Sequence, residues 1–471
     1  MMSTKITPAA AALVLLACVA CSRTGAVNDP DSELRRLVGA RARAVWVQQD
    51  GSDPRAGGDQ LVLMGFDTED GRGERVILSE RRSYVKPLLT PDGTRIVYSS
   101  RVLPGPPEVF VVNFDGSQHR KLADGFALDV WLNPVDEREW VYVGTDNDKY
   151  DFNRVHRFPI DAPAERQLFW NGSVVGADGF RVSRDGRHFG GLCPWPAAGV
   201  TSVQNGEFEK FGEGCWTSLT SVRGLLFWIF DGAHRNVTMV DVDGGAKWMV
   251  NLTGAGGFEG AEVYHPRWSN HPRFMTMSGP YNQGGANQAR TGGKQVEIYV
   301  GRFSADYTGI EAWARVTNNS AGDTYPDVWI DAANTPHARL PNGPIGPPAM
   351  AATDRSPGMA AARRLVVNVR VARPGPIPTP ESILPYRNAL VVNEYEIIDI
   401  LEGEYDGGGS IRIAQWAIRD SQVLPDARKD PGAAFTLSVE RYEDHPELEG
   451  ERLVSDREIP RATLYYETRR R

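Results

Sequence analysis

The sequence predicts an all-β protein: a six-bladed β-propeller with end-to-end strand closure, followed by a small C-terminal β-barrel or sandwich domain. Short segments rich in β-branched and aromatic residues recur from residue 41 to residue 332, with Gly, Pro and Asp turns between them. Four such segments fit into about 40 residues, which is the size of one four-stranded propeller blade. Stretches with helical periodicity are scarce.

The unit from Lys86 to Leu122 shows the pattern most clearly. Its first strand runs into Pro91-Asp92-Gly93, where proline presets φ, aspartate caps the turn and glycine tolerates a left-handed conformation. Its other strands are expected at residues 95–99, 108–114 and 121–122. A single blade of this kind cannot bury both of its faces, so it needs neighbouring units.

Five further units have the same order of strands as this one. We place them at residues 43–78, 128–168, 179–211, 215–250 and 264–316. The first of them has only three strands, whereas Tyr325–Asp331 has the pattern of an opening strand without a unit of its own. We therefore expect Tyr325–Asp331 to pair with Arg43–Gln48, which closes the ring and removes exposed sheet edges.

The motif Pro-x-hydrophobic-Ser/Thr-x-Asp-Gly is clearest in Pro87–Leu122 and is degraded in Val182–Gly186 and Pro266–Asn270. This pattern resembles the WD-like repeat of TolB-type propellers over residues 40–331. The resemblance implies a protein of the bacterial envelope that binds other proteins in the periplasm. The same repeat also occurs in peptidases and sugar-binding proteins.

Residues 1–21 resemble a lipoprotein-type signal peptide. Lys5 precedes a short apolar run, and two cysteines follow it: Cys18 has a leucine three residues upstream, and Cys21 has a small residue before it. Both are candidates for lipidation, and an ordinary cleaved signal peptide is the alternative. Lipidation would anchor the protein to a membrane, facing the periplasm or the cell surface. Residues 22–40 are polar and acidic and predict a tether.

The two remaining cysteines, Cys193 and Cys215, are predicted to form a structural disulfide, because an exported chain meets an oxidising compartment. The bridge would close a loop of about 22 residues. A metal pair or a reactive thiol is the alternative. The formal net charge of −8 and the lack of a basic stripe argue against nucleic acid as a partner.

Residues 333–362 are rich in Pro, Gly and Ala and predict a linker, with a loop packed on the propeller as the alternative. Residues 363–467 predict an all-β accessory domain that resembles small OB-like or sandwich modules.

No catalytic residues, cofactor or metal site are predicted. The sequence has no Gly-x-Ser-x-Gly, His-Glu-x-x-His or phosphate-binding glycine loop, and no Cys-x-x-Cys outside residues 1–21. Acidic segments at 146–153 and 443–447 carry possible metal ligands, but they favour solvated turns.

An insertion at residues 278–293 of the sixth unit carries the candidate binding residues. Amides, one tyrosine and one arginine on a glycine-rich backbone suit sugar hydroxyls or peptide carbonyls. These residues are Tyr281, Asn282, Gln283, Asn287, Gln288 and Arg290. A rim loop without a ligand is the alternative.

The function predicted from these features is non-covalent binding of an envelope protein or polysaccharide at one face of the ring. One alternative is a polysaccharide hydrolase or lyase, with Asp129, Glu262 and Asp327 facing the central channel. Two carboxylates about 5–10 Å apart would favour that enzyme. The other alternative is a structural scaffold in an envelope complex.

Overall fold

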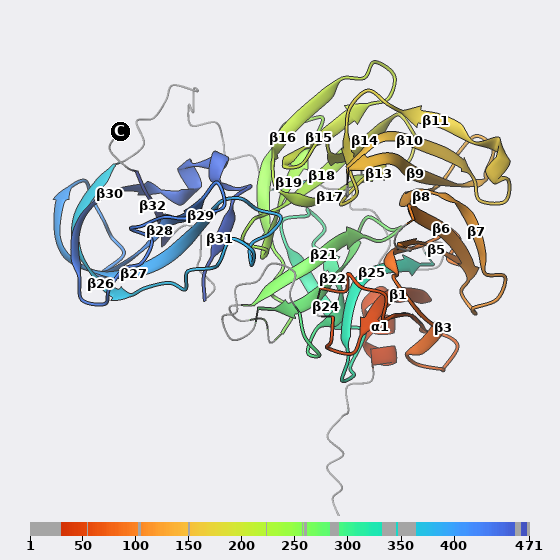
Figure 1. Ribbon diagram of the computed structural model, residues 1–471, viewed down its shortest axis with the longest axis horizontal. Helices are drawn as coiled ribbons and strands as arrows, with labels where there is room; N and C mark the ends of the chain where they lie inside the picture. Colours follow the sequence, from red (N-terminus) through yellow and green to blue (C-terminus); the bar gives the residue numbers. More distant parts are fainter. Residues whose placement is uncertain are drawn as a thin grey trace, which may run out of the picture.

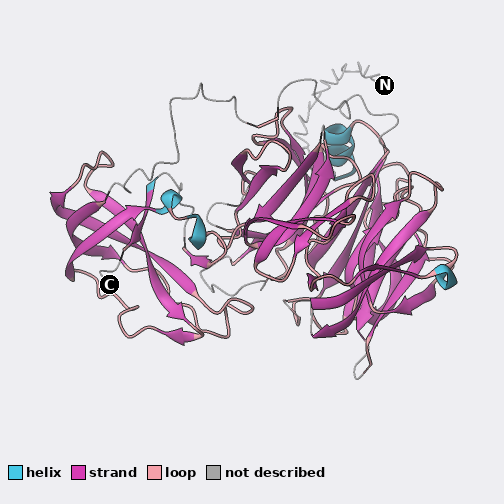
Figure 2. Cartoon of the chain, turned by 90° about the horizontal axis from the view of Figure 1, so that it is seen from above, coloured by secondary structure: helices cyan, strands magenta, loops and turns pink. Residues whose placement is uncertain are grey.

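The computed structural model describes residues 30–331, 345–346 and 364–468, except for 54, 102–104, 149–150, 223, 257, 259–260, 283–291 and 457–462. Figure 1 shows a ring of small sheets with a second β domain beside it, and Figure 2 shows the same two parts from above. The predicted all-β class is confirmed. The one α-helix of the described residues is α1 (Pro30–Val38).

Six sheets form the ring, and each takes its innermost strand from a different part of the chain. From the channel outward, the first blade consists of β25 (Gly322–Ile330), β1 (Ala42–Gln49), β2 (Leu61–Asp67) and β3 (Arg75–Arg82). The second consists of β4 (Val85–Leu89), β5 (Arg95–Arg101), β6 (Pro107–Asn113) and β7 (Arg120–Asp124). The third consists of β8 (Phe126–Leu132), β9 (Glu139–Asp148), β10 (Asp151–Pro159) and β11 (Gln167–Trp170), with β12 (Val175–Gly176) beside β10.

The fourth blade consists of β13 (Arg181–Val182), β14 (His188–Leu192), β15 (Ala197–Ser202) and β16 (Phe208–Glu213). The fifth consists of β17 (Cys215–Ser221), β18 (Leu225–Phe230), β19 (Asn236–Asp241) and β20 (Lys247–Asn251). The sixth consists of β21 (Glu262–Trp268), β22 (Phe274–Tyr281), β23 (Glu297–Phe303) and β24 (Ile310–Arg315). We number the blades one to six in this order.

The ring closes as predicted, because β25 pairs antiparallel with β1. The pairing runs from Ala42 opposite Ile330 to Gln49 opposite Gly322, and β2 pairs with the other edge of β1. The two ends of the propeller therefore share blade one.

The tripeptide Asp-Val-Trp occurs in both β8 and β25 and ties each blade to the next one. The side chain of Asp327 accepts a hydrogen bond from the Leu89 N–H at 2.8 Å, and that of Asp129 accepts one from the Val182 N–H at 2.9 Å. The Trp329 indole donates to the carbonyl of Pro91 at 2.9 Å, and the Trp131 indole donates to that of Ser183 at 3.0 Å. Each tripeptide thus binds both the inner strand and the turn of the following blade.

The glycine of the Asp-Gly turn is needed for this contact. Gly93 has φ +72°, and a Cβ there would lie 2.3 Å from the Trp329 ring. Gly186 has the same φ, and a Cβ there would lie 2.9 Å from the Trp131 ring. The repeat motif therefore encodes packing between blades as well as a turn.

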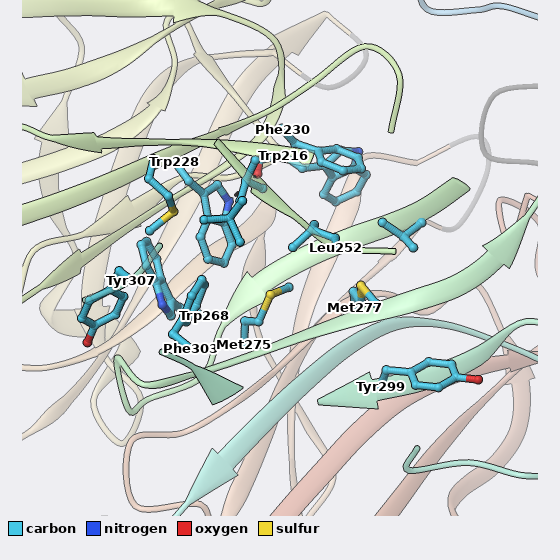
Figure 3. Packing of buried hydrophobic residues seen from close by; sticks show 14 of the residues in the cluster. Trp216, Trp228, Phe230, Leu252, Trp268, Met275, Met277, Tyr299, Phe303 and Tyr307 are labelled. Carbon is cyan, nitrogen blue, oxygen red and sulfur yellow. Dashed lines mark hydrogen bonds between the residues drawn. The ribbon is translucent and has the colours of Figure 1, made fainter. Parts of the chain in front are cut away.

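Apolar side chains fill the space between adjacent blades. Between blades five and six, Trp228 and Trp268 stack with ring centroids 4.0 Å apart, beside Phe303 (Figure 3). Each sheet buries both of its faces in this way, as a propeller requires.

The predicted tether is wrong for residues 30–38, which form α1. Leu34, Leu37 and Val38 are buried against blades one and six, and Arg302 donates to the Leu37 carbonyl at 3.0 Å. The spacing of these three apolar residues places them on one side of a helix. Residues 22–29, and the signal peptide with Cys18 and Cys21, lie outside the described residues.

Of the predicted linker, the structure describes Ile345 and Gly346. Ile345 packs against the core of blades five and six, and the Gly346 N–H donates to the Asp306 carbonyl at 2.6 Å. At these two residues the chain lies on the propeller.

The C-terminal domain is a closed five-stranded barrel. Its strands are β26 (Leu365–Arg373), β27 (Ala389–Glu402), β28 (Ser410–Arg419), β32 (Leu464–Glu467) and β30 (Ala434–Arg441), in that order around the barrel. β28 and β32 are parallel, and the other neighbours are antiparallel. This is the arrangement of an OB-type barrel, one of the two modules predicted. Smaller elements flank it: β29 (Gln422–Val423), η4 (Tyr442–Asp444), η5 (Pro446–Leu448) and β31 (Arg452–Val454).

Candidate functional site

A cavity of ≈ 570 Å³ opens into the central channel at the ends of the six inner strands. Half of the residues that line it are apolar or aromatic, and they include Leu89, Val130, Trp131, Leu219 and Trp329. Hydroxyl and amide groups come from Thr90, Thr220, Ser221 and Asn270. We call this space the wide cavity.

Charged side chains form the floor of the wide cavity. Arg267 donates from Nη2 to Asp129 Oδ1 and from Nε to Asp327 Oδ1, both at 3.1 Å. It thereby joins blade six to blades three and one across the channel. Burial raises the pKa of the Asp327 carboxyl, and the Arg267 charge opposes that shift.

A second arginine crosses the channel beside the first. Arg181 of blade four donates to the carbonyls of Trp268 and Ser269, at 2.5 and 2.8 Å. Burial, with the Arg267 charge as the next cause, lowers the pKa of Arg181 to about 10.

The backbone places these charges in one layer. Most inner strands have an irregular pairing or a left-handed residue near their start, and a regularly paired residue follows it. In blades three, four, six and one these residues are Asp129, Arg181, Arg267 and Asp327.

The left-handed residues line a smaller cavity of ≈ 30 Å³ on the other side of this layer. Four of them are not glycine: Lys86, Trp216, His265 and Tyr325, with φ between +45° and +57°. Arg267 lines both cavities and so separates them. Lys86 donates to the carbonyls of Leu128 and Ala177, and burial lowers its pKa to about 7.

All three carboxylates considered for an enzyme are bound by other groups of the protein. Asp129 and Asp327 are close together, since both contact one guanidinium, but each also accepts a backbone N–H of the next blade. Glu262 lies at the opposite end of the inner strands and binds the C-terminal domain. Both aspartates therefore have structural roles that account for their positions.

The structure describes residues 278–282 and 292–293 of the predicted rim loop. Tyr281 is buried, with its hydroxyl 3.2 Å from that of Ser278 and its ring against Tyr264. Its ring is thus part of the propeller core. Asn282 follows with φ +52°, while Gln283, Asn287, Gln288 and Arg290 lie outside the described residues.

The predicted disulfide is not present, although both cysteines lie in the described part of the chain. Cys193 packs in the core between blades three and four, whereas Cys215 packs between blades five and six. The Cys215 sulfur lies 3.3 Å from the hydroxyl of Tyr386. Burial raises the pKa of the Cys193 thiol to about 12. The two side chains are packed in different cores, which explains why they do not meet.

The two domains are joined by a buried ionic contact that sequence reasoning missed. Arg452 of the barrel is 0% exposed and donates to Glu262 at 2.5 Å. Its Nη1 also lies 3.0 Å from His234 Nδ1, which is 3.1 Å from Glu262 Oε2, and His234 Nε2 lies 2.8 Å from the Tyr386 hydroxyl. Burial and the Arg452 charge lower the pKa of His234 to about 4.

The backbones of the two domains also meet directly. The Gly232 N–H donates to the Glu449 carbonyl at 3.1 Å, and the Leu453 N–H donates to the Gly232 carbonyl at 3.2 Å. A Cβ on Gly232 would lie 1.9 Å from the carbonyl oxygen of Glu451. Glycine is therefore required at this contact.

Two further features were searched for in the described residues. No group of three His, Cys, Asp or Glu side chains is placed to hold a metal ion there. No helix among these residues has the length and apolar character needed to cross a membrane.

Comparison with known proteins finds propellers among solved structures. TolB from Acinetobacter baumannii is 14% identical, with 63% of this chain and 70% of that chain covered and a TM-score of 0.42. A prolyl endopeptidase is 11% identical (82% and 62% covered, TM-score 0.33), and an oligogalacturonate lyase in complex with manganese is 12% identical (49% and 64%, TM-score 0.31). The match spans less than two thirds of each of these two enzymes. At such identities the likeness concerns the fold alone.

No protein-family model and no curated protein sequence matches this chain. The predicted six-bladed propeller with end-to-end strand closure is confirmed by the six closed blades.

Proposed function

We propose that this protein binds an extended segment of an envelope protein in the wide cavity and does not catalyse a reaction. The observation that carries this proposal is the charged floor of Asp129, Arg267 and Asp327 beneath an open space of ≈ 570 Å³. Ligand sites commonly have such volumes, with mainly apolar walls and a few fixed polar groups.

The positions of the carboxylates support binding rather than hydrolysis. A glycosidase needs one carboxyl group as an acid and another as a base or nucleophile. Asp129 and Asp327 each accept one hydrogen bond from Arg267 and one from a backbone N–H of the next blade. Both aspartates belong to an Asp-Val-Trp tripeptide, and in both tripeptides the aspartate forms a contact between blades.

A substitution at the mouth of the wide cavity tests the site. Thr220→Trp places a large ring among the lining residues, and we expect it to reduce partner binding at least about tenfold. Met249→Trp is the matched control, because Met249 is exposed on the outer strand β20 of the same blade. Equal binding by both variants, or polysaccharide cleavage that Asp129→Asn abolishes, would contradict the proposal.

The envelope location is proposed from the sequence of residues 1–21. Metabolic labelling with a radioactive fatty acid should label the full chain in a bacterial host. We expect either Cys18→Ser or Cys21→Ser to abolish the label, which would identify the lipidated residue. Labelling of neither the wild type nor the variants would show that the chain is not a lipoprotein.

A further inference from the structure

Two guanidinium groups lie at the floor of the wide cavity, and they offer more donors than the protein uses. Arg181 and Arg267 both line this cavity. Each guanidinium has five N–H donors. In the part of the chain that the structure describes, Arg181 makes hydrogen bonds to two backbone carbonyls and Arg267 to two carboxylates.

The charges around these donors favour an anion. Three arginines and two aspartates line the wide cavity, the third arginine being Arg184 at the mouth. Each aspartate already accepts one Arg267 N–H and one backbone N–H. Arg181 has carbonyl acceptors rather than a carboxylate; burial and then the Arg267 charge lower its pKa, while the charges of Asp129 and Asp327 oppose this shift. A ligand anion between the two arginines would relieve their repulsion.

The walls favour a peptide over an acidic sugar. Leu132, which is 47% exposed, and the half-buried Val130 and Pro272 offer apolar surface for side chains of a peptide. The indole N–H groups of Trp131 and Trp329 donate to the next blade, and glycines pack against both rings. The indole N–H groups are therefore already used in hydrogen bonds, and one face of each ring is covered, so these indoles are poorly placed to bind a sugar.

We propose that the segment bound in the wide cavity is an acidic peptide, with an Asp or Glu carboxylate held between Arg181 and Arg267. This inference rests on the proposed function and specifies its ligand. The carboxylate would receive charge-assisted hydrogen bonds from both guanidinium groups, while apolar side chains of the peptide contact the walls. The peptide lies on the opposite side of the charged layer from the small cavity.

The experiment uses pools of synthetic octapeptides on an array and the purified full chain. Each pool has Asp, Glu, Asn, Gln or Lys at a fixed central position and mixed residues elsewhere. We expect the Asp and Glu pools to bind at least about tenfold more tightly than their amide counterparts, the ratio that one charged hydrogen bond supports. Thr220→Trp should abolish this binding.

Variants of the floor identify the anion site. Arg181→Gln should remove the preference for acidic pools, and circular dichroism and the melting temperature verify its folding. Arg187→Gln removes the same charge from an exposed residue that does not line the wide cavity, so binding should stay unchanged. If Arg181→Gln does not fold, the wild-type preference for acid over amide pools still decides the inference.

The outcomes separate the two proposals. Binding of amide or Lys pools that Thr220→Trp abolishes would overturn the acidic ligand but support the proposed function. Binding of oligogalacturonate, used as the acidic sugar probe, without binding of any peptide pool would overturn the peptide. Binding of no probe at the wide cavity would overturn both proposals.

Discussion

At the scale of single residues, one layer of the propeller shows how the type of side chain at a position determines what that position does. In four blades the residue that follows the irregular or left-handed start of the inner strand is charged and lines the wide cavity: Asp129, Arg181, Arg267 or Asp327. Their ion pairs and hydrogen bonds divide the channel into two cavities.

The Asp-Gly turn leads to a prediction at this scale. Gly93→Ala should destabilise the protein by about 3 kcal/mol or more, because the new methyl group meets the Trp329 ring and φ is positive. Gly71→Ala has a similar φ of +63° but nothing within 4 Å, so it should cost only about 1 kcal/mol. Urea unfolding of both variants measures the difference. Equal losses would show that the tryptophan contact is unimportant.

At the scale of elements, the barrel uses its loops to dock on the propeller. Tyr386 lies between β26 and β27, and Arg452 lies between β30 and β32. In other OB-type barrels these two loops commonly contact oligonucleotides or oligosaccharides. Here they contact blade five and blade six, so this surface is already occupied.

The buried histidine of this contact predicts a pH dependence. The pKa of His234 is about 4 when the domains are docked and about 6.5 when it is exposed. The undocked state therefore binds a proton first, so docking weakens as pH falls from about 6.5 toward 4, by up to roughly 3 kcal/mol. Facing His234 are Glu262, Tyr264, Arg452 and Tyr386, with Asp231 nearby.

Hydrogen exchange of residues 449–455 measures this docking directly. Exchange should accelerate between pH 6.5 and pH 4 after correction for the intrinsic rate, and His234→Gln should remove most of that change. Glu262 loses its contribution at lower pH still, because Arg452 and His234 hold its pKa below the usual range despite burial. Asp323 in blade one has the opposite pH dependence. Burial raises its pKa to about 7, so its contribution to the stability of blade one is lost as pH rises. An unchanged exchange rate would contradict the role of His234.

At the scale of the whole molecule, ring closure and docking combine two domains into one body. β25 and β1 close the propeller without an exposed inner edge, and the Arg452–Glu262 contact joins the barrel to it. Figure 2 shows the barrel beside the ring, and the contacts between Gly232, Glu449 and Leu453 connect them. We therefore expect the two domains to unfold together.

Removal of the buried arginine should separate the domains. Arg452→Met leaves Glu262 buried without its partner, which costs about 3–5 kcal/mol. Scanning calorimetry should show one transition for the wild type and two for this variant. Arg387→Met is the control, because Arg387 belongs to the same domain but forms an exposed pair with Asp420 at 3.4 Å. A single transition in Arg452→Met would show that other contacts hold the domains.

Much of the propeller could be predicted because its signals are local. The Pro91-Asp92-Gly93 turn, the strands around it and the unmatched strand at 325–331 are visible in a short window of sequence. The helix α1 was missed, although Leu34, Leu37 and Val38 have helical spacing, because the surrounding residues are polar. A repeated signal for the cavity floor was also present, since Arg181-Val182-Ser183 and Arg267-Trp268-Ser269 occupy the same place in their units.

The pattern of turns and strands by itself determined the class of fold, the number of blades and the closure of the ring, because these follow from contacts between neighbours in sequence and from the need to pair every strand. Only the tertiary structure decided that Arg267 separates two cavities, that Cys193 and Cys215 pack apart, and that Glu262 binds Arg452. Those contacts join residues from different blades or domains, and their geometry depends on how whole sheets pack against each other.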